Sequence, residues 1–216
     1  MTLLDEVIEE LYARHTADSE AAGRARREYE ERRGKVHQDD ELREAWSAAF
    51  VEWYVVERVD PQATGAASGL PPAVATYRQL AGAGDPRAAV VRALVTSQRS
   101  LFEVRVMAKD GRVELLDLIG GADFEVRDRP LDGVEIGDVA ELRLVGVGDR
   151  IRFGRTFVYH PKEARGAIVE RARAMLAKGA TRRDVIDQIA QLRVQVTRYR
   201  HMPPARVYEL GSRIMG

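Results

Sequence analysis

The sequence contains no cysteine among its 216 residues. This absence excludes disulfide bonds, zinc sites with thiolate ligands and cysteine nucleophiles. The four histidines stand singly, without the spacing of helical zinc sites, and no G-x-S-x-G motif or complete phosphate-binding loop occurs. We therefore expect no metal, no cofactor and no catalytic residue, although an active site assembled from distant residues stays open.

Long apolar runs are also missing. The run at residues 53–56 is typical, and it falls far below the roughly 20 residues that a transmembrane helix needs. The first ten residues are acidic and amphipathic, and they lack the basic start and cleavage site of a signal peptide. Apolar residues still make up 45% of the chain, which is enough for a core. These features predict a cytoplasmic globular protein that does not bind membranes.

The net charge is zero, but it is unevenly distributed. Residues 1–60 hold 9 Arg and Lys against 16 Asp and Glu, a net charge of −7, whereas residues 161–216 hold 12 against 5, a net of +7. Opposite charges favour docking of the two ends, within one chain or between chains. Residues 16–35 form a charged helical arm that is too polar to be buried on its own. We therefore expect self-association as a homodimer.

Apolar side chains at helical spacing predict helices towards both ends of the chain. The helix predicted over residues 42–54 carries both tryptophans, so we interpret it as a main element of the core. Thr181 and Asp184 have the spacing of a capping box in front of another helix. The predicted helical segments are residues 3–12, 16–35, 42–54, 73–80, 85–98, 161–178, 185–200 and 205–214.

Between these helices the apolar residues alternate, as in half-buried strands. Asp110-Gly111 and Gly120-Gly121 are typical hairpin turns. Five short strands predict an α+β fold, with a small antiparallel β-barrel or curled sheet between N-terminal and C-terminal helices. The predicted segments are residues 1–58 (helices and acidic arm), 59–100 (linker and short helices), 101–160 (barrel) and 161–216 (basic helices).

Asp117 is the most notable acidic residue, because it lies within a predicted strand. Its alternation with Val113 and Leu115 indicates that its side chain points inward. We interpret it as a buried carboxylate that accepts hydrogen bonds from turn amides near Gly120-Gly121. General acid–base catalysis is the alternative role for this carboxylate.

The basic C-terminal segment supplies candidate interaction residues. These are Arg193, Arg198, Tyr199, Arg200 and Arg206. Arginines next to an aromatic ring are typical of surfaces that contact phosphate groups and bases. The apolar stripe of residues 185–199, however, assigns Tyr199 to the core.

Residues 42–162 carry a pattern of aromatic residues, turns and strand alternation. The pattern consists of W46-x-x-x-F50-x-E52-W53, Y77, S100-x-F102-E103-V104, D110-G111, L116-x-L118-I119-G120, F124-x-V126, G137-D138-V139-x-x-L142-R143-L144-V145, G148 and F153-G154. It resembles an uncharacterised bacterial domain family often found beside the zinc-binding SEC-C motif. The resemblance implies no activity and no catalytic residue. Since the chain has no cysteine, it does not carry the SEC-C zinc motif itself.

Three functions remain open at this point. The missing catalytic motifs and the complementary charged ends favour a non-catalytic protein-binding or adaptor protein. The alternative is a nucleic-acid-binding protein that uses the barrel and the basic C-terminal helix. A pocket lined by Asp117, Arg143 or Arg152 would instead favour an enzyme.

Overall fold

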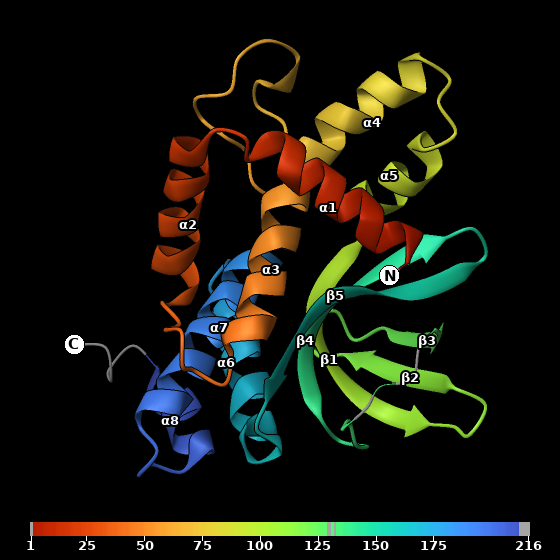
Figure 1. The fold of residues 1–216 in the computed structure, drawn as a ribbon. Helices are drawn as coiled ribbons and strands as arrows, with labels where there is room; N and C mark the ends of the chain where they lie inside the picture. Colours follow the sequence, from red (N-terminus) through yellow and green to blue (C-terminus); the bar gives the residue numbers. More distant parts are fainter. Residues whose placement is uncertain (1, 129–130, 132, 212–216) are drawn as a thin grey trace.

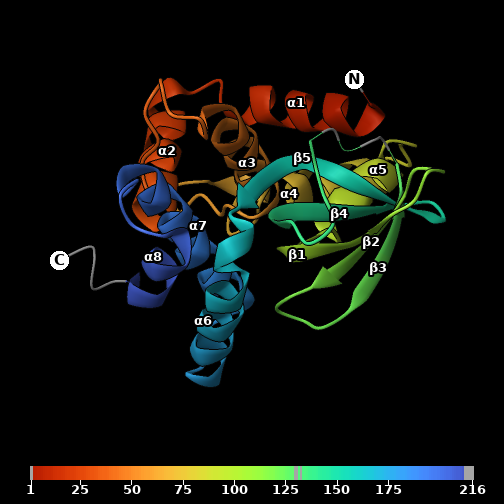
Figure 2. The ribbon, with the colours of Figure 1, turned by 90° about the horizontal axis from the view of Figure 1, so that it is seen from below.

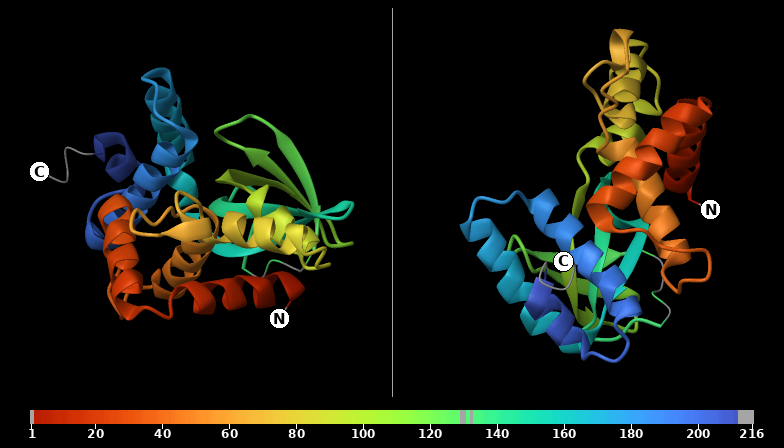
Figure 3. Two further views of the ribbon diagram at one scale, coloured as in Figure 1. Left: turned by 90° about the horizontal axis from the view of Figure 1, so that it is seen from above. Right: turned by 90° about the vertical axis from the view of Figure 1, so that its left-hand side faces the viewer.

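The computed structural model describes residues 2–128, 131 and 133–211 (Figure 1). Its helices lie mainly on one side of a single sheet, and α4 and α5 extend from the end opposite α6 and α8 (Figures 1 and 3). The helices are α1 (Leu3–His15), α2 (Ser19–Arg33), α3 (Arg43–Val56), α4 (Pro72–Gly82), α5 (Ala88–Val95), α6 (Arg165–Ala177), α7 (Arg182–Arg198) and α8 (Pro204–Leu210). The strands are β1 (Gln98–Met107), β2 (Arg112–Asp117), β3 (Asp123–Arg127), β4 (Val139–Val147) and β5 (Arg150–His160).

The helix starts follow from local capping. Thr2 caps α1 and Thr181 caps α7, and each Thr forms a capping box with the Asp three residues later. The capping box predicted at Thr181 is thus confirmed. The last predicted helix is α8, which ends at Leu210, and residues 212–214 of that prediction lie outside the described residues.

The five strands form one antiparallel sheet in the order β3-β2-β1-β4-β5. The turns at Asp110-Gly111 and Gly120-Gly121 connect β1 to β2 and β2 to β3, as predicted. The α+β prediction is confirmed, but the predicted barrel is wrong, because the sheet is open throughout the described residues.

A side chain, and not a backbone ladder, connects the two edges of the open sheet. The carboxylate of Asp128, just after β3, accepts hydrogen bonds from the Phe153 amide at 2.9 Å and from Arg152 Nη1 at 2.7 Å. Both partners belong to β5, the strand at the opposite edge. This contact joins the two edges, although β3 and β5 are not paired.

An aromatic core lies between the N-terminal helices and β5. Trp46, Trp53 and Tyr29 are at most 1% exposed, and the Tyr29 ring meets Trp53 at 5.2 Å between centroids. Burial of such large rings contributes roughly 1.5–3 kcal/mol per side chain. The tryptophan-bearing helix α3 is therefore a main core element, as the sequence predicted.

The charged arm predicted at residues 16–35 becomes α2, which lies along α7 of the same chain. Ala25, Tyr29 and Arg33 face inward and are fully buried. Figure 2 shows α2 and α7 side by side, whereas α6 projects away from the body. A single chain therefore covers one face of the arm without a second subunit.

Candidate functional site

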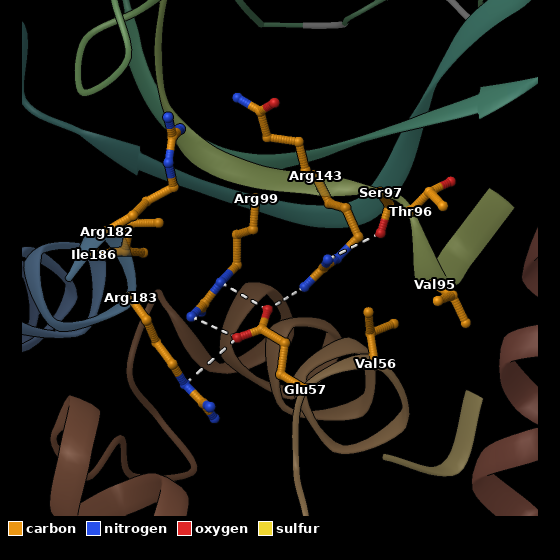
Figure 4. A pocket seen from close by; sticks show the side chains of 11 residues that line it. Val56, Glu57, Val95, Thr96, Ser97, Arg99, Arg143, Arg182, Arg183 and Ile186 are labelled. Atoms are coloured by element: carbon orange, nitrogen blue, oxygen red, sulfur yellow. Dashed lines mark hydrogen bonds and ion pairs between the residues drawn. The ribbon is translucent and has the colours of Figure 1, made fainter. Parts of the chain in front are cut away.

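A pocket of about 480 Å³ opens where the end of α3, the junction of α5 with β1, the middle of β4 and the first turn of α7 meet (Figure 4). We call it the arginine pocket. Four arginines and a single carboxylate are among its lining residues, which are Val56, Glu57, Val95, Thr96, Ser97, Gln98, Arg99, Arg143, Arg182, Arg183 and Ile186.

Sheet pairing places two of these arginines together. Arg99 on β1 lies directly opposite Arg143 on β4, and both are buried. Like charges at directly opposed positions repel each other. The pair therefore requires carboxylates close by.

Glu57 supplies the shared carboxylate from the residue that follows α3. Both of its oxygens lie 3.0 Å from Arg99 nitrogens, it accepts a short hydrogen bond from Arg143 Nη2, and Arg183 Nε lies 3.7 Å away. Figure 4 shows these three arginines directed at Glu57 from different elements. Burial raises the pKa of Glu57, but Arg99, Arg143 and Arg183 together lower it to about 2.

Behind Glu57, a second layer of carboxylates neutralises the buried arginines. Glu141 is fully buried and accepts hydrogen bonds from Arg33 and from Arg99, the latter at 3.2 Å. Asp187 on α7 lies 3.2 Å from Arg99 and 3.5 Å from Arg33. Burial raises the pKa of Glu141, and the two arginines lower it below its ordinary value. Arg99 therefore has carboxylate partners besides Glu57.

Arg143 likewise has a second carboxylate, Glu52 of α3, at 3.5 Å. Glu52 also accepts hydrogen bonds from the Arg155 amide and the Thr156 hydroxyl of β5. Gly154 makes this approach feasible, since a Cβ there would stand 2.4 Å from Glu52 Oε1. Because Gly154 has no side chain, Glu52 of α3 can approach β5 closely and pair with Nε of Arg143.

Asp117 lies behind the pocket and is 1% exposed. It accepts hydrogen bonds from Ser100 at 2.5 Å, from Gln98 at 2.9 Å and from Arg182 at 2.6 Å, and the Ile119 amide donates to it at 2.9 Å. Burial raises its pKa, but these hydrogen bonds lower the pKa below its ordinary value. Asp117 thus fixes Arg182 at the pocket wall, a contact that the sequence did not indicate.

The predicted C-terminal interaction residues lie away from the arginine pocket, and the four arginines contact their own chain. Arg193 donates to the Tyr159 carbonyl and to Glu41. The ring of Tyr199 meets His201 edge-on at 6.2 Å. Arg198, Arg200 and Arg206 donate to the Lys35 carbonyl, the Thr197 carbonyl and Glu209.

Sequence reasoning missed Glu57, Arg99 and Arg183 as site residues, and it named Arg143 only as a condition for an enzyme. These residues come from four elements that are far apart in the chain. One signal was readable, because Arg143 interrupts an apolar run in β4 that is buried on both faces. A charge in such a run needs a buried partner, but the sequence does not identify that partner.

The described residues contain no group of three or more His, Asp or Glu side chains placed to hold a metal ion. Among them, no helix is both long and apolar enough to cross a membrane. Comparison with protein-family models, curated proteins and solved structures found no match to the chain. The resemblance to the SEC-C-associated family therefore stays a hypothesis.

Proposed function

We propose that this protein is a non-catalytic binding protein that recognises an anionic group of its partner in the arginine pocket. The observation that carries the proposal is the composition of the pocket, in which four arginines face one carboxylate in a space open to solvent. Arginine keeps its charge at all physiological pH values and binds carboxylate and phosphate oxygens through two parallel hydrogen bonds. A cluster of arginines is thus a typical receptor for an acidic or phosphorylated motif.

The chemistry of the lining favours binding over proton transfer. With a pKa of about 2, Glu57 is a weak base at neutral pH. The Ser97 hydroxyl donates to the Leu94 carbonyl at 2.5 Å and accepts from Arg143 at 3.0 Å, so it faces no base that could activate it. Of the residues named as pointing to an enzyme, Arg143 lines the arginine pocket and Asp117 lies behind it. Arg152 lines a separate pocket, where it pairs with Asp128.

Calorimetric titration with inorganic phosphate and citrate tests the proposal. Arg183 is the residue to replace, because it is partly exposed and its ion pair with Glu57 is loose, at 3.7 Å. We expect both anions to bind the native protein, and we expect Arg183→Ala to weaken binding by about tenfold or more.

Arg173→Ala is the matched control, since Arg173 on α6 is 72% exposed and pairs only with Glu170 among the described residues. Its affinity for both anions should equal that of the native protein. The proposal is wrong if neither anion binds, or if the two variants change the affinity equally.

A further inference from the structure

Glu57 belongs to a continuous cluster of ion pairs that carries an excess positive charge. We call it the charge cluster. It contains five arginines and four carboxylates, namely Arg32, Arg33, Arg99, Arg143 and Arg183 with Glu52, Glu57, Glu141 and Asp187. The net charge of these groups is therefore +1 with Glu57 in place and +2 without it.

Glu57 is also the carboxylate of the charge cluster that can leave most easily. Its side chain is 17% exposed, whereas those of Glu52, Glu141 and Asp187 are 1%, 0% and 7% exposed. If Glu57 turned towards solvent, Arg99 would keep two carboxylates and Arg143 would keep Glu52. The buried arginines would thus stay paired while the pocket lost its negative charge.

The groups around Glu57 match a ligand with more oxygens and more charge than a carboxylate. Three guanidinium groups converge on its two oxygens. Arg143 is 2% exposed and lines the pocket, and because its Nε already faces Glu52 at 3.5 Å, its Nη atoms are the ones directed at Glu57 and Ser97. The first turn of the 17-residue helix α7 adds the positive end of a helix dipole. A phosphate monoester offers three terminal oxygens and a charge of about −1.5 to −2 at neutral pH.

We propose that the arginine pocket is a phosphate-monoester site and that Glu57 occupies it as an internal competitor until the ligand displaces it. This inference rests on the proposed function and names its ligand class. The exchange replaces one negative charge by about two, which neutralises the +2 of the remaining charge cluster. A phosphodiester or a carboxylate carries the single charge that Glu57 already supplies, so its exchange with Glu57 gains nothing.

The test compares the native protein with Glu57→Gln in calorimetric titrations at neutral pH. The probes are phenyl phosphate, dimethyl phosphate and benzoate. We expect Glu57→Gln to bind phenyl phosphate about tenfold or more tightly than the native protein does, because the charged competitor is gone. Phenyl phosphate should bind both proteins more tightly than the other two probes. The matched control is Glu170→Gln, a 77% exposed glutamate on α6, which should leave every affinity unchanged.

The outcomes separate this inference from the proposed function. If Glu57→Gln weakens or does not change phenyl phosphate binding, Glu57 organises the site and is no competitor. If benzoate binds as tightly as phenyl phosphate, the ligand class is wrong. In both cases an anion-binding protein remains. If no probe binds either protein, both proposals fail. ³¹P NMR checks independently whether phenyl phosphate binds the native protein. Binding should change the chemical shift of the phosphorus, and Arg183→Ala should remove this change.

The phosphate can belong to a protein or to a small metabolite, since the two share the same terminal group. A phosphoserine peptide and glucose 6-phosphate distinguish these sources. A peptide that binds more tightly than free phosphoserine identifies a protein partner, and a sugar phosphate that binds more tightly than the peptide identifies a metabolite. Failure of both to bind, when inorganic phosphate does bind, overturns the monoester proposal.

Discussion

At the scale of residues, the buried carboxylates of the charge cluster have unequal roles. Glu141 is fully buried between Arg33 and Arg99, and loss of one partner in a buried ion pair destabilises a protein by roughly 3–5 kcal/mol. We expect Glu141→Gln to lower the free energy of unfolding by about this amount. Urea denaturation measures it, and Glu57→Gln should lose less than half as much, because the buried Arg99 and Arg143 keep other carboxylates. Equal losses would contradict the distinct role of Glu57.

His160 makes stability depend on pH. It is 3% exposed, and its Nδ1 lies 2.8 Å from the Tyr208 hydroxyl oxygen. Burial lowers the pKa of His160, Glu141 opposes this effect, and Arg193 and Arg33 add to it, so that the pKa falls to about 3. Between about pH 3 and the ordinary value of about 6.5, the unfolded chain binds a proton that the folded chain does not. Stability therefore rises with pH across this window.

We expect the native protein to lose up to roughly 1.4 kcal/mol per pH unit from His160 as pH falls below about 6.5. Urea denaturation at about pH 7 and about pH 5 measures this loss. In His160→Gln the dependence should be smaller, since the amide does not titrate. An unchanged slope in the variant would assign the pH dependence to other groups.

Part of the site and its surroundings could be predicted from the sequence alone. Asp117 could be chosen from the sequence because strand alternation indicates which face a side chain occupies. The opposed pair of Arg99 and Arg143 could not be predicted in this way, because strand register depends on pairing between distant segments of the chain. Glu57 and Arg183 come from helices whose packing on the sheet depends on the whole core.

At the scale of elements, α7 links stability to the proposed binding. Thr181 caps α7 directly before Arg182 and Arg183. Loss of such a cap costs about 1 kcal/mol and frays the first helical turn. We expect Thr181→Ala to destabilise the protein by this amount and to weaken binding of phenyl phosphate. Urea denaturation and calorimetry measure the two effects.

The chain offers a matched control in α1, where Thr2 and Asp5 form the same capping box. Thr2→Ala should cost a similar free energy of unfolding without changing the affinity for phenyl phosphate. If both variants weaken binding to the same degree, the effect comes from general destabilisation and not from the first turn of α7.

The elements that the sequence predicted best are those with local signals. Apolar periodicity, the capping box at Thr181 and the turn at Asp110-Gly111 depend on neighbouring residues, and the structure confirms them. The barrel was wrong because closure depends on pairing between β3 and β5, which no local pattern encodes. The side chain of Asp128 reaches β5 instead.

At the scale of the whole molecule, the oppositely charged ends meet within one chain. Helix α2 lies on α7, and Glu41 pairs with Arg193. The individual contacts do not simply follow the net charges, since Arg32 and Arg33 of the acidic half pair with Asp187 of the basic half. This docking removes one reason for expecting a homodimer, which stays a prediction that light scattering at low salt can test.

The contacts of the C-terminal arginines also bear on nucleic-acid binding, the alternative function predicted from the sequence. Arg198 and Arg200 are exposed, but each donates to a backbone carbonyl of its own chain. A protein surface that makes only a few phosphate contacts binds nucleic acid weakly, and its affinity falls as the salt concentration rises. We expect no affinity tighter than about micromolar for duplex or single-stranded nucleic acid at about 150 mM salt. Nanomolar binding in fluorescence anisotropy, lost in Arg198→Ala and Arg200→Ala, would contradict this prediction.

A crystal structure of the protein grown with phenyl phosphate will show whether the arginine pocket holds an anion. We expect the phosphoryl group to lie within hydrogen-bond distance of Arg99, Arg143 and Arg183, with the Glu57 carboxylate turned out of the pocket. A phosphoryl group bound elsewhere, or an empty pocket with Glu57 still held by its three arginines at saturating ligand, would contradict this expectation.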